Sequence, residues 1–167
     1  LGYKNPLYGL YAADVEKFKT DRPIIKREKN FIYVGRLVHI KGVHLLVEAY
    51  KQYINTVDDP WGLIIAGVGE LETMVASVDG VEYLGFIQPE KLPELLASNS
   101  CFILPSLWEP WGVVIHEAAA AGLPIISTYE CGAVSEFVRD GCNGYVVPGE
   151  VNVLKNVMKK ISTMPTQ

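Results

Sequence analysis

The sequence predicts an α/β domain: a Rossmann-like parallel sheet of roughly six strands with helices on both faces. Two observations carry this prediction. Short apolar runs alternate with helical patterns from Phe31 onward, which is typical of parallel strands joined by crossover helices. The runs are rich in Val, Ile, Leu and Phe without regular polar alternation, as in strands covered on both faces.

The elements follow in order along the chain. The apolar runs predict strands at residues 31–34, 62–66, 81–84, 101–104, 124–127 and 144–147. The patterns between and after them predict helices at residues 42–54, 70–77, 90–97, 113–121, 134–138 and 151–161. Tyr33 and Cys101 fall inside expected strands and are assigned to the core. We divide the chain into an N-terminal segment with a charged connection (1–30), the Rossmann-like domain (31–150) and a C-terminal helix with its tail (151–167).

Composition narrows the class of protein. A chain of 167 residues fits one domain with a substantial core. The net charge of −4 argues against nucleic acid as a partner, because binding to a phosphate backbone needs a basic face. Three cysteines without C-x-x-C spacing predict reduced thiols rather than disulfides or a zinc site. These features, with no apolar stretch long enough to cross a membrane, predict a cytoplasmic protein.

Ligands of open parallel sheets bind beyond the carboxyl ends of the strands, so the strand-to-helix turns are the places to search. The first turn, residues 35–42 (GRLVHIKG), carries Arg36 and Lys41 between two glycines. A guanidinium can bind two phosphate oxygens, an ammonium supplies a point charge, and a helix N-terminus adds free amides. The alternative is two solvated surface cations. His39 lies in the same loop, and a lone histidine is a weak signal for a catalytic role.

The turn after the second expected strand, residues 66–69 (AGVG), contains two glycines. It lacks the third glycine of a dinucleotide fingerprint and does not follow the first strand. We therefore expect a tight turn that brings its backbone close to a ligand or to a neighbouring loop.

The strongest candidate is residues 106–117 (SLWEPWGVVIHE), before and within the fourth expected helix. Gly112 at the helix start would leave the amides of Val113 and Val114 open to an anion. Glu117 lies one turn further along the same face, where a carboxylate can accept from both hydroxyls of a diol such as a ribose. Glu109, beside Pro110, could bind sugar hydroxyls. The alternative is an ordinary loop acid and a solvated helix face, against which the small apolar residues after Glu117 argue.

The remaining candidates have simpler explanations. Trp108 and Trp111 could pack against a sugar ring or wedge the loop onto the core. Glu136, in the turn after the fifth strand, could reach the cleft or stabilise its own helix terminus. His44 and His116 are assigned structural or solvent-facing roles.

Four motifs in this order carry a family resemblance: GR-x4-KG, E-P-W-G-x4-E, the helix ending A-A-A-A-G-L-P, and E-x-G-x3-E. Together with the DVEKFK segment that begins at Asp14, they resemble the C-terminal, donor-binding domain of family four glycosyltransferases, over residues 11–149. Those enzymes have the GT-B architecture of two facing Rossmann-like domains. The resemblance implies retention of anomeric configuration without a metal or other cofactor. One departure is Cys131, which stands where the family often has glycine, and which could narrow the turn on the sugar side.

The resemblance also implies site roles. Arg36 and Lys41 would bind the diphosphate of the donor and stabilise charge on the leaving group, and Glu109 would hold hydroxyls of the sugar. Glu117 would bind the ribose, and the backbone of Phe86 and Ile87 would meet the base. The donor-binding set is completed by Gly35, Trp111, Gly112, Val113 and Val114.

The function that the resemblance implies is retaining transfer of a hexosyl group from a UDP- or GDP-sugar to a hydroxyl acceptor, in polysaccharide or glycoconjugate synthesis. The acceptor would be held by an N-terminal domain absent from this chain, so the fragment alone should be inactive. That domain could also contact a membrane peripherally. The alternatives are a nucleotide-sugar epimerase or hydrolase of the same architecture, and a non-catalytic nucleotide-sugar-binding module. A Rossmann dehydrogenase is disfavoured because the first turn lacks three glycines.

Overall fold

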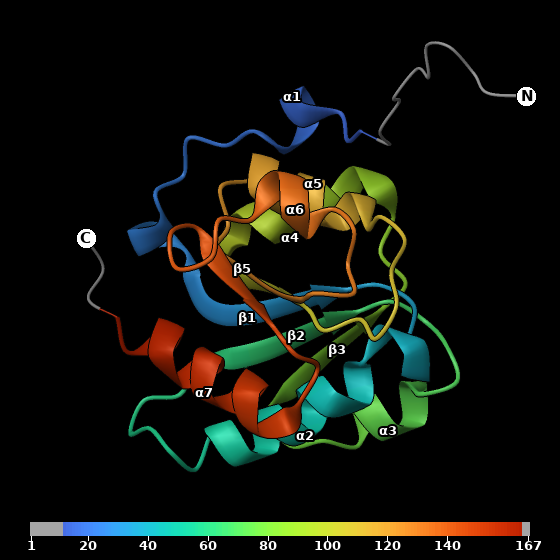
Figure 1. The fold of residues 1–167 in the computed structure, drawn as a ribbon, viewed down its shortest axis with the longest axis vertical. Helices are drawn as coiled ribbons and strands as arrows, with labels where there is room; N and C mark the ends of the chain where they lie inside the picture. The colour runs from blue at the N-terminus through green and yellow to red at the C-terminus, as the bar shows by residue number, and fades with distance from the viewer. Residues whose placement is uncertain (1–11, 165–167) are drawn as a thin grey trace, which may run out of the picture.

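A computed structural model describes residues 12–164, and they form one six-stranded, fully parallel sheet in the order β3-β2-β1-β4-β5-β6 (Figure 1). The predicted α/β fold class is confirmed. The strands are β1 (Glu28–Val34), β2 (Gly62–Ala66), β3 (Val81–Gly85), β4 (Asn99–Leu104), β5 (Ile125–Thr128) and β6 (Gly144–Val147). The α-helices are α1 (Val15–Phe18), α2 (Val43–Tyr53), α3 (Glu72–Ala76), α4 (Leu92–Ser98), α5 (Val113–Ala120), α6 (Val134–Phe137) and α7 (Val151–Ser162).

Helices cover both faces of the sheet (Figure 1). One face carries α2, α3 and α7, and the other carries α1, α4, α5 and α6. On the first face, α7 packs along α2 and buries Leu154, Met158 and Ile161. Burial of each such side chain contributes about 1.5–3 kcal/mol, so α7 is a stabilising part of the layer.

Most predicted elements are present, and the differences lie at their ends. β1 begins at Glu28, three residues before the predicted strand, and β4 begins at Asn99 rather than residue 101. Glu28 pairs with Asn99 across the two strands, so pairing extends beyond the apolar runs into polar residues. The helix predicted at 70–77 is limited to α3, because the Leu71 N–H donates to Leu37 O (2.9 Å) and keeps the residue in the preceding loop. The 90–97 pattern forms a 3-10 turn (Pro89–Lys91) followed by α4.

The centre of the sheet is apolar and closely packed. Tyr33 and Cys101 are both fully buried, which confirms their assignment to the core. On α5, Ile115 and Ala118 are buried against the sheet. The small alanine side chains let this helix lie close to the strands, and its first turn is therefore fixed near the ends of β1 and β4.

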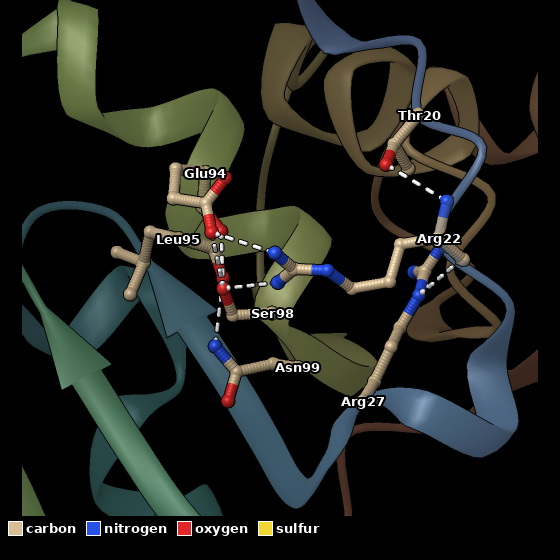
Figure 2. Close-up of polar contacts among 7 residues, drawn as sticks. All are labelled: Thr20, Arg22, Arg27, Glu94, Leu95, Ser98 and Asn99. Atoms are coloured by element: carbon tan, nitrogen blue, oxygen red, sulfur yellow. Dashed lines mark hydrogen bonds and ion pairs between the residues drawn. The ribbon is translucent and has the colours of Figure 1, made fainter.

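The residues before β1 run along α4 and α5 (Figure 1). Phe18 of α1 is buried in the core cluster. Arg22 donates to Ser98 Oγ (2.9 Å) and pairs with Glu94 (3.1 Å) on α4 (Figure 2). The Arg27 guanidinium, in a residue only 9% exposed, donates to Arg22 O and to Ala121 O at the end of α5. Most side chains of this stretch are exposed as expected, but these anchors attach its backbone to the domain.

Candidate functional site

The candidate site lies where the order of strands reverses, between β1 and β4. Successive connections leave the two sides of such a point in opposite directions, and this opens a crevice at the carboxyl ends of the strands. The loop after β1 meets the loop after β4 there, and Leu107 N–H donates to Ile40 O at 2.8 Å. The first and third candidate turns of the sequence are therefore neighbours.

Lys41 and Glu109 form an ion pair across this crevice. Their side chains are 12% and 17% exposed, so Lys41 is not the solvated surface cation of the simpler explanation. The two residues are 68 positions apart in the chain. Removing one member of such a poorly solvated pair would leave the other uncompensated.

Arg36 lies exposed at the first turn, directly after β1. Among residues 12–164 no carboxylate lies within ion-pair distance of its guanidinium. The backbone of Arg36 is held against the domain core, because the buried Tyr33 hydroxyl donates to Arg36 O at 2.8 Å. Burial raises the pKa of Tyr33 well above its usual range, so this hydroxyl keeps its proton for the bond.

The start of α5 offers backbone donors to the crevice. The N–H groups of Val113 and Val114 cannot bond within a helix that begins at Val113, and Gly112 provides no side-chain cap. Gly112 adopts a left-handed conformation (φ 84°). A Cβ added there would lie 2.9 Å from Cys131 Sγ and 3.0 Å from Glu109 Cγ, so this turn accepts only glycine without rearrangement.

Glu117 follows one turn later on α5 and is partly buried in the cleft wall. Burial raises the pKa of its carboxyl. No hydrogen bond or ion pair joins this carboxylate to the rest of the chain between residues 12 and 164. It is therefore desolvated but unpaired, which suits a group that accepts hydrogen bonds from a ligand.

Cys131 is buried against the loop that carries Glu109 and Trp111, and it does not line the cleft. Its Sγ donates to Trp111 O at 3.3 Å, and the flanking backbone binds the same loop through Glu109 N–H to Glu130 O (3.0 Å) and Gly132 N–H to Glu109 O (3.0 Å). Cys131 thus supports the backbone around Trp111 and Gly112.

Every catalytic or donor-binding residue predicted from the sequence lines one of two adjoining cavities. A cavity of about 520 Å³ is lined by the predicted residues Gly35, Arg36, Lys41, Glu109, Trp111, Gly112, Val113, Val114 and Glu117. A cavity of about 220 Å³ is lined by Phe86 and Ile87, together with Gly35 and Arg36. Arg36 therefore lines both cavities. The larger cavity also carries carboxylates and helix amides, whereas the lining of the smaller cavity is mostly apolar.

Some residues of this site carry no clear signal in the sequence. Val34 and Leu104 line the larger cavity, and the only signal for them was their position at the ends of apolar runs. Tyr33 was assigned to the core alone, and nothing in the sequence pairs its hydroxyl with Arg36. The 66–69 turn approaches a neighbouring loop as expected, with Gly35 N–H donating to Ala66 O (3.0 Å) and Leu37 N–H to Val68 O (2.9 Å).

Glu136, His39 and His44 lie outside the cleft, and the two tryptophans differ from each other. Glu136 is exposed on α6 and does not line either cavity. His39 and His44 contact each other, with ring centroids 4.7 Å apart. Trp111 packs edge-on against Phe137 (6.3 Å), which favours the wedge explanation for this residue, whereas Trp108 is 61% exposed.

A third cavity, of about 570 Å³, lies at the opposite end of the sheet and is lined by Arg27, Trp61, Gly144 and Ile161 among others. It contains none of the predicted site residues. Within the described part of the chain, no group of three His, Cys, Asp or Glu side chains could hold a metal ion. No helix among residues 12–164 has the length and apolar character needed to cross a membrane.

The three cysteines should differ sharply in reactivity. Burial raises the pKa of the Cys101 and Cys131 thiols, whereas Cys142 is exposed. Because the thiolate is the reactive form, we expect iodoacetamide to label Cys142 in the native chain and the other two only after denaturation. Peptide mass spectrometry would measure this. Native labelling of Cys131 at a comparable rate would contradict the buried position of its sulfur.

The family model of glycosyl transferases group 1 matches residues 14–166 of this chain. The chain belongs to this family. The predicted resemblance is thereby confirmed, over nearly the whole described sequence.

Individual relatives agree with this result. The chain is 33% identical over 133 residues to spore coat protein SA of Bacillus subtilis, which covers 72% of this chain and 35% of the relative. It is 31% identical over 135 residues to alpha-D-kanosaminyltransferase of Streptomyces kanamyceticus, covering 77% and 33% respectively. The crystal structure of Anabaena HepE in complex with UDP-glucose has a TM-score of 0.73 and 25% identity, covering 91% of this chain and 46% of that one. This glycosyltransferase domain therefore spans about a third of the length of these curated relatives.

Proposed function

We propose that this glycosyltransferase domain binds a nucleoside-diphosphate sugar and, with an acceptor-binding domain outside this chain, transfers the hexosyl group to a hydroxyl with retention of configuration. The observation that carries the proposal is the larger cavity itself. It combines a cationic loop, free helix amides and an unpaired carboxylate on one wall. Anion-binding and diol-binding groups in one crevice match the two polar parts of such a donor.

In this proposal Arg36 and Lys41 bind the diphosphate, and the amides of Val113 and Val114 lie at the positive end of α5. These groups would stabilise the negative charge that develops on the departing nucleoside diphosphate, without reorganisation at that moment. The chain's own charges would supply this stabilisation, and the reaction that we propose, following the family resemblance, needs no metal. Lys41 is already fixed by Glu109, which limits the ordering needed when the donor binds.

In this proposal the other parts of the donor lie in different cavities, the ribose and sugar in the larger one and the base in the smaller one. Glu117 would accept from the ribose hydroxyls, and Glu109 with the backbone of Trp111 and Gly112 would bind the sugar. The base would lie in the smaller cavity, against the backbone of Phe86 and Ile87 and beside Gly35. The UDP-glucose complex of Anabaena HepE, at 25% identity, supports a uridine donor as the first candidate, ahead of GDP-sugars. The acceptor, a polysaccharide or glycoconjugate, would approach from the open side of the larger cavity.

Calorimetric titration of the chain with UDP, GDP and their sugars tests this proposal. We expect one nucleotide class to bind, and Arg36→Ala to weaken it by about ten- to a hundredfold, as expected for loss of charge-assisted hydrogen bonds of ~1.5–3 kcal/mol. The matched control is Arg139→Ala, an exposed arginine before β6 at the other end of the sheet, which should leave affinity unchanged. Wild-type affinity in Arg36→Ala would place the diphosphate elsewhere. The absence of binding to any nucleotide by the folded chain would contradict a complete donor site in this domain.

A further inference from the structure

His116 connects the N-terminal segment of the described chain to α5. It lies on α5 between Ile115 and Glu117, and neighbouring helix positions point about 100° apart. Glu117 faces the cleft, whereas His116 contacts the backbone of Ala13: the Ala13 N–H donates to His116 Nδ1 at 3.0 Å. Nδ1 is therefore the acceptor in this contact, and Nε2 takes no part in it.

The same ring also contacts the aromatic residues that support the cleft. His116 stacks on Phe137 of α6, with centroids 4.2 Å apart and planes within 14°. Phe137 meets Trp111 edge-on at 6.3 Å. Trp111 lines the larger cavity directly before Gly112, and its carbonyl accepts from Ala133 N–H at 2.8 Å. One imidazole therefore touches both the N-terminal segment and the support of the cleft wall.

The segment that His116 binds is otherwise attached further along the chain. Phe18 is buried where α1 packs against α4 and α5. Arg22 is attached to α4, as Figure 2 shows, and Arg27 is attached to the end of α5 through Ala121 O. Among the described polar contacts of residues 12–14, only the hydrogen bond from Ala13 to His116 reaches α5. Among residues 12–164, the hydrogen bond to Nδ1 is thus the first point along the chain at which this segment is joined to the helix that carries the site.

We infer that His116 is a positioning residue that couples the docking of residues 12–18 to the wall of the donor cleft at Trp111–Val114. The consequence for donor affinity rests on the proposed function. If Ala13 leaves Nδ1, the ring loses its fixed orientation, and the stack on Phe137 and the position of Trp111 loosen with it. The order of the N-terminal segment thereby controls how well the helix amides and the sugar-side loop are preformed.

Three substitutions separate the two contacts of the ring. Ala13→Pro removes the N–H donor and leaves His116 intact. His116→Phe keeps an aromatic ring against Phe137 but removes the acceptor, and His116→Asn keeps an acceptor near the position of Nδ1 but removes the ring. The matched control is Asp14→Asn, which breaks the exposed Asp14–Lys17 pair (3.5 Å) in the same segment without touching His116.

Amide hydrogen exchange and nucleotide titration of the chain are the measurements. We expect Ala13→Pro and His116→Phe each to raise exchange several-fold at residues 12–18 and also at 111–114. Both should weaken nucleotide binding about three- to tenfold, the range for loss of one hydrogen bond. The double variant should show no further loss, because both changes remove the same contact. His116→Asn should restore protection of residues 12–18 but not of 111–114, and Asp14→Asn should change neither.

Two results would overturn the inference. One is faster exchange confined to residues 12–18, which would make His116 a local anchor only. The other is additive effects of Ala13→Pro and His116→Phe. If the wild-type chain binds no nucleotide, the proposed function fails, but exchange at residues 111–114 still decides the coupling.

Discussion

Replacing Glu117 with glutamine is expected to weaken binding of the proposed nucleotide donor and, at the same time, to make the domain more stable. Burial raises the pKa of this carboxyl, so the folded state carries a charged group in a site that disfavours the charge. Glutamine removes the charge but has only one acceptor oxygen for two ribose hydroxyls. We expect affinity for the nucleotide to fall at least about tenfold, and the melting temperature to rise.

The dependence on pH has a defined sign. The folded-state pKa of Glu117 lies above its ordinary value of 4.5, so the charge opposes folding fully above the raised pKa and not at all below the ordinary one. The stability gain from glutamine should therefore be largest at neutral pH and vanish below the ordinary value. Nucleotide binding by the wild-type chain should weaken as the pH falls through the raised pKa of Glu117. This loss should occur at a higher pH than it would for an exposed carboxylate. The Glu117→Gln variant should not show this pH dependence.

Calorimetry and thermal unfolding across this pH range measure both effects. Glu136→Gln is the control, because Glu136 is exposed on α6 and lines neither cavity; it should change neither property. Unchanged affinity in Glu117→Gln would contradict the ribose assignment. A lower melting temperature at neutral pH would mean that the carboxylate stabilises the fold.

Replacing Gly42 with alanine is expected to lower the free energy of unfolding by on the order of 3 kcal/mol or more. Gly42 joins the cationic loop to α2 with φ 67°, and an added Cβ would lie 1.9 Å from the carbonyl oxygen of Pro105. That oxygen belongs to the loop after β4, so the clash would separate the two loops that form the cleft. Chemical denaturation would measure the change in the free energy of unfolding.

Gly141→Ala separates strain from the clash. Gly141 has a similar φ of 74° with no atom within 4 Å of an added Cβ, so alanine there should cost only about 1–2 kcal/mol, the ordinary penalty for left-handed backbone. Equal losses in the two variants would contradict the close approach of the two loops.

Much of the fold follows from local sequence. Continuous apolar runs such as residues 62–66 and 144–147 predicted β2 and β6 with their observed bounds, because strands covered on both faces need apolar side chains at successive positions. The predicted start of β1 was wrong by three residues, because Glu28 joins the sheet through its pairing with Asn99. Backbone pairing to a distant strand needs no apolar side chain, so no local pattern marks it.

The sequence by itself determined the parallel α/β fold and which loops carry chemically suited residues, because both depend on short-range spacing within one turn or strand. It also determined the family, because the order of four short motifs along the chain can be read directly from the sequence. Only the tertiary structure decided that β1 lies beside β4. That order places Lys41 against Glu109, 68 positions away, and sets Tyr33 and Arg36 at the edge of the same crevice. It also left Glu117 without a partner among the described residues. Strand order, solvation and cross-loop pairing arise from packing between distant segments, and no window of the sequence contains both members of such a contact.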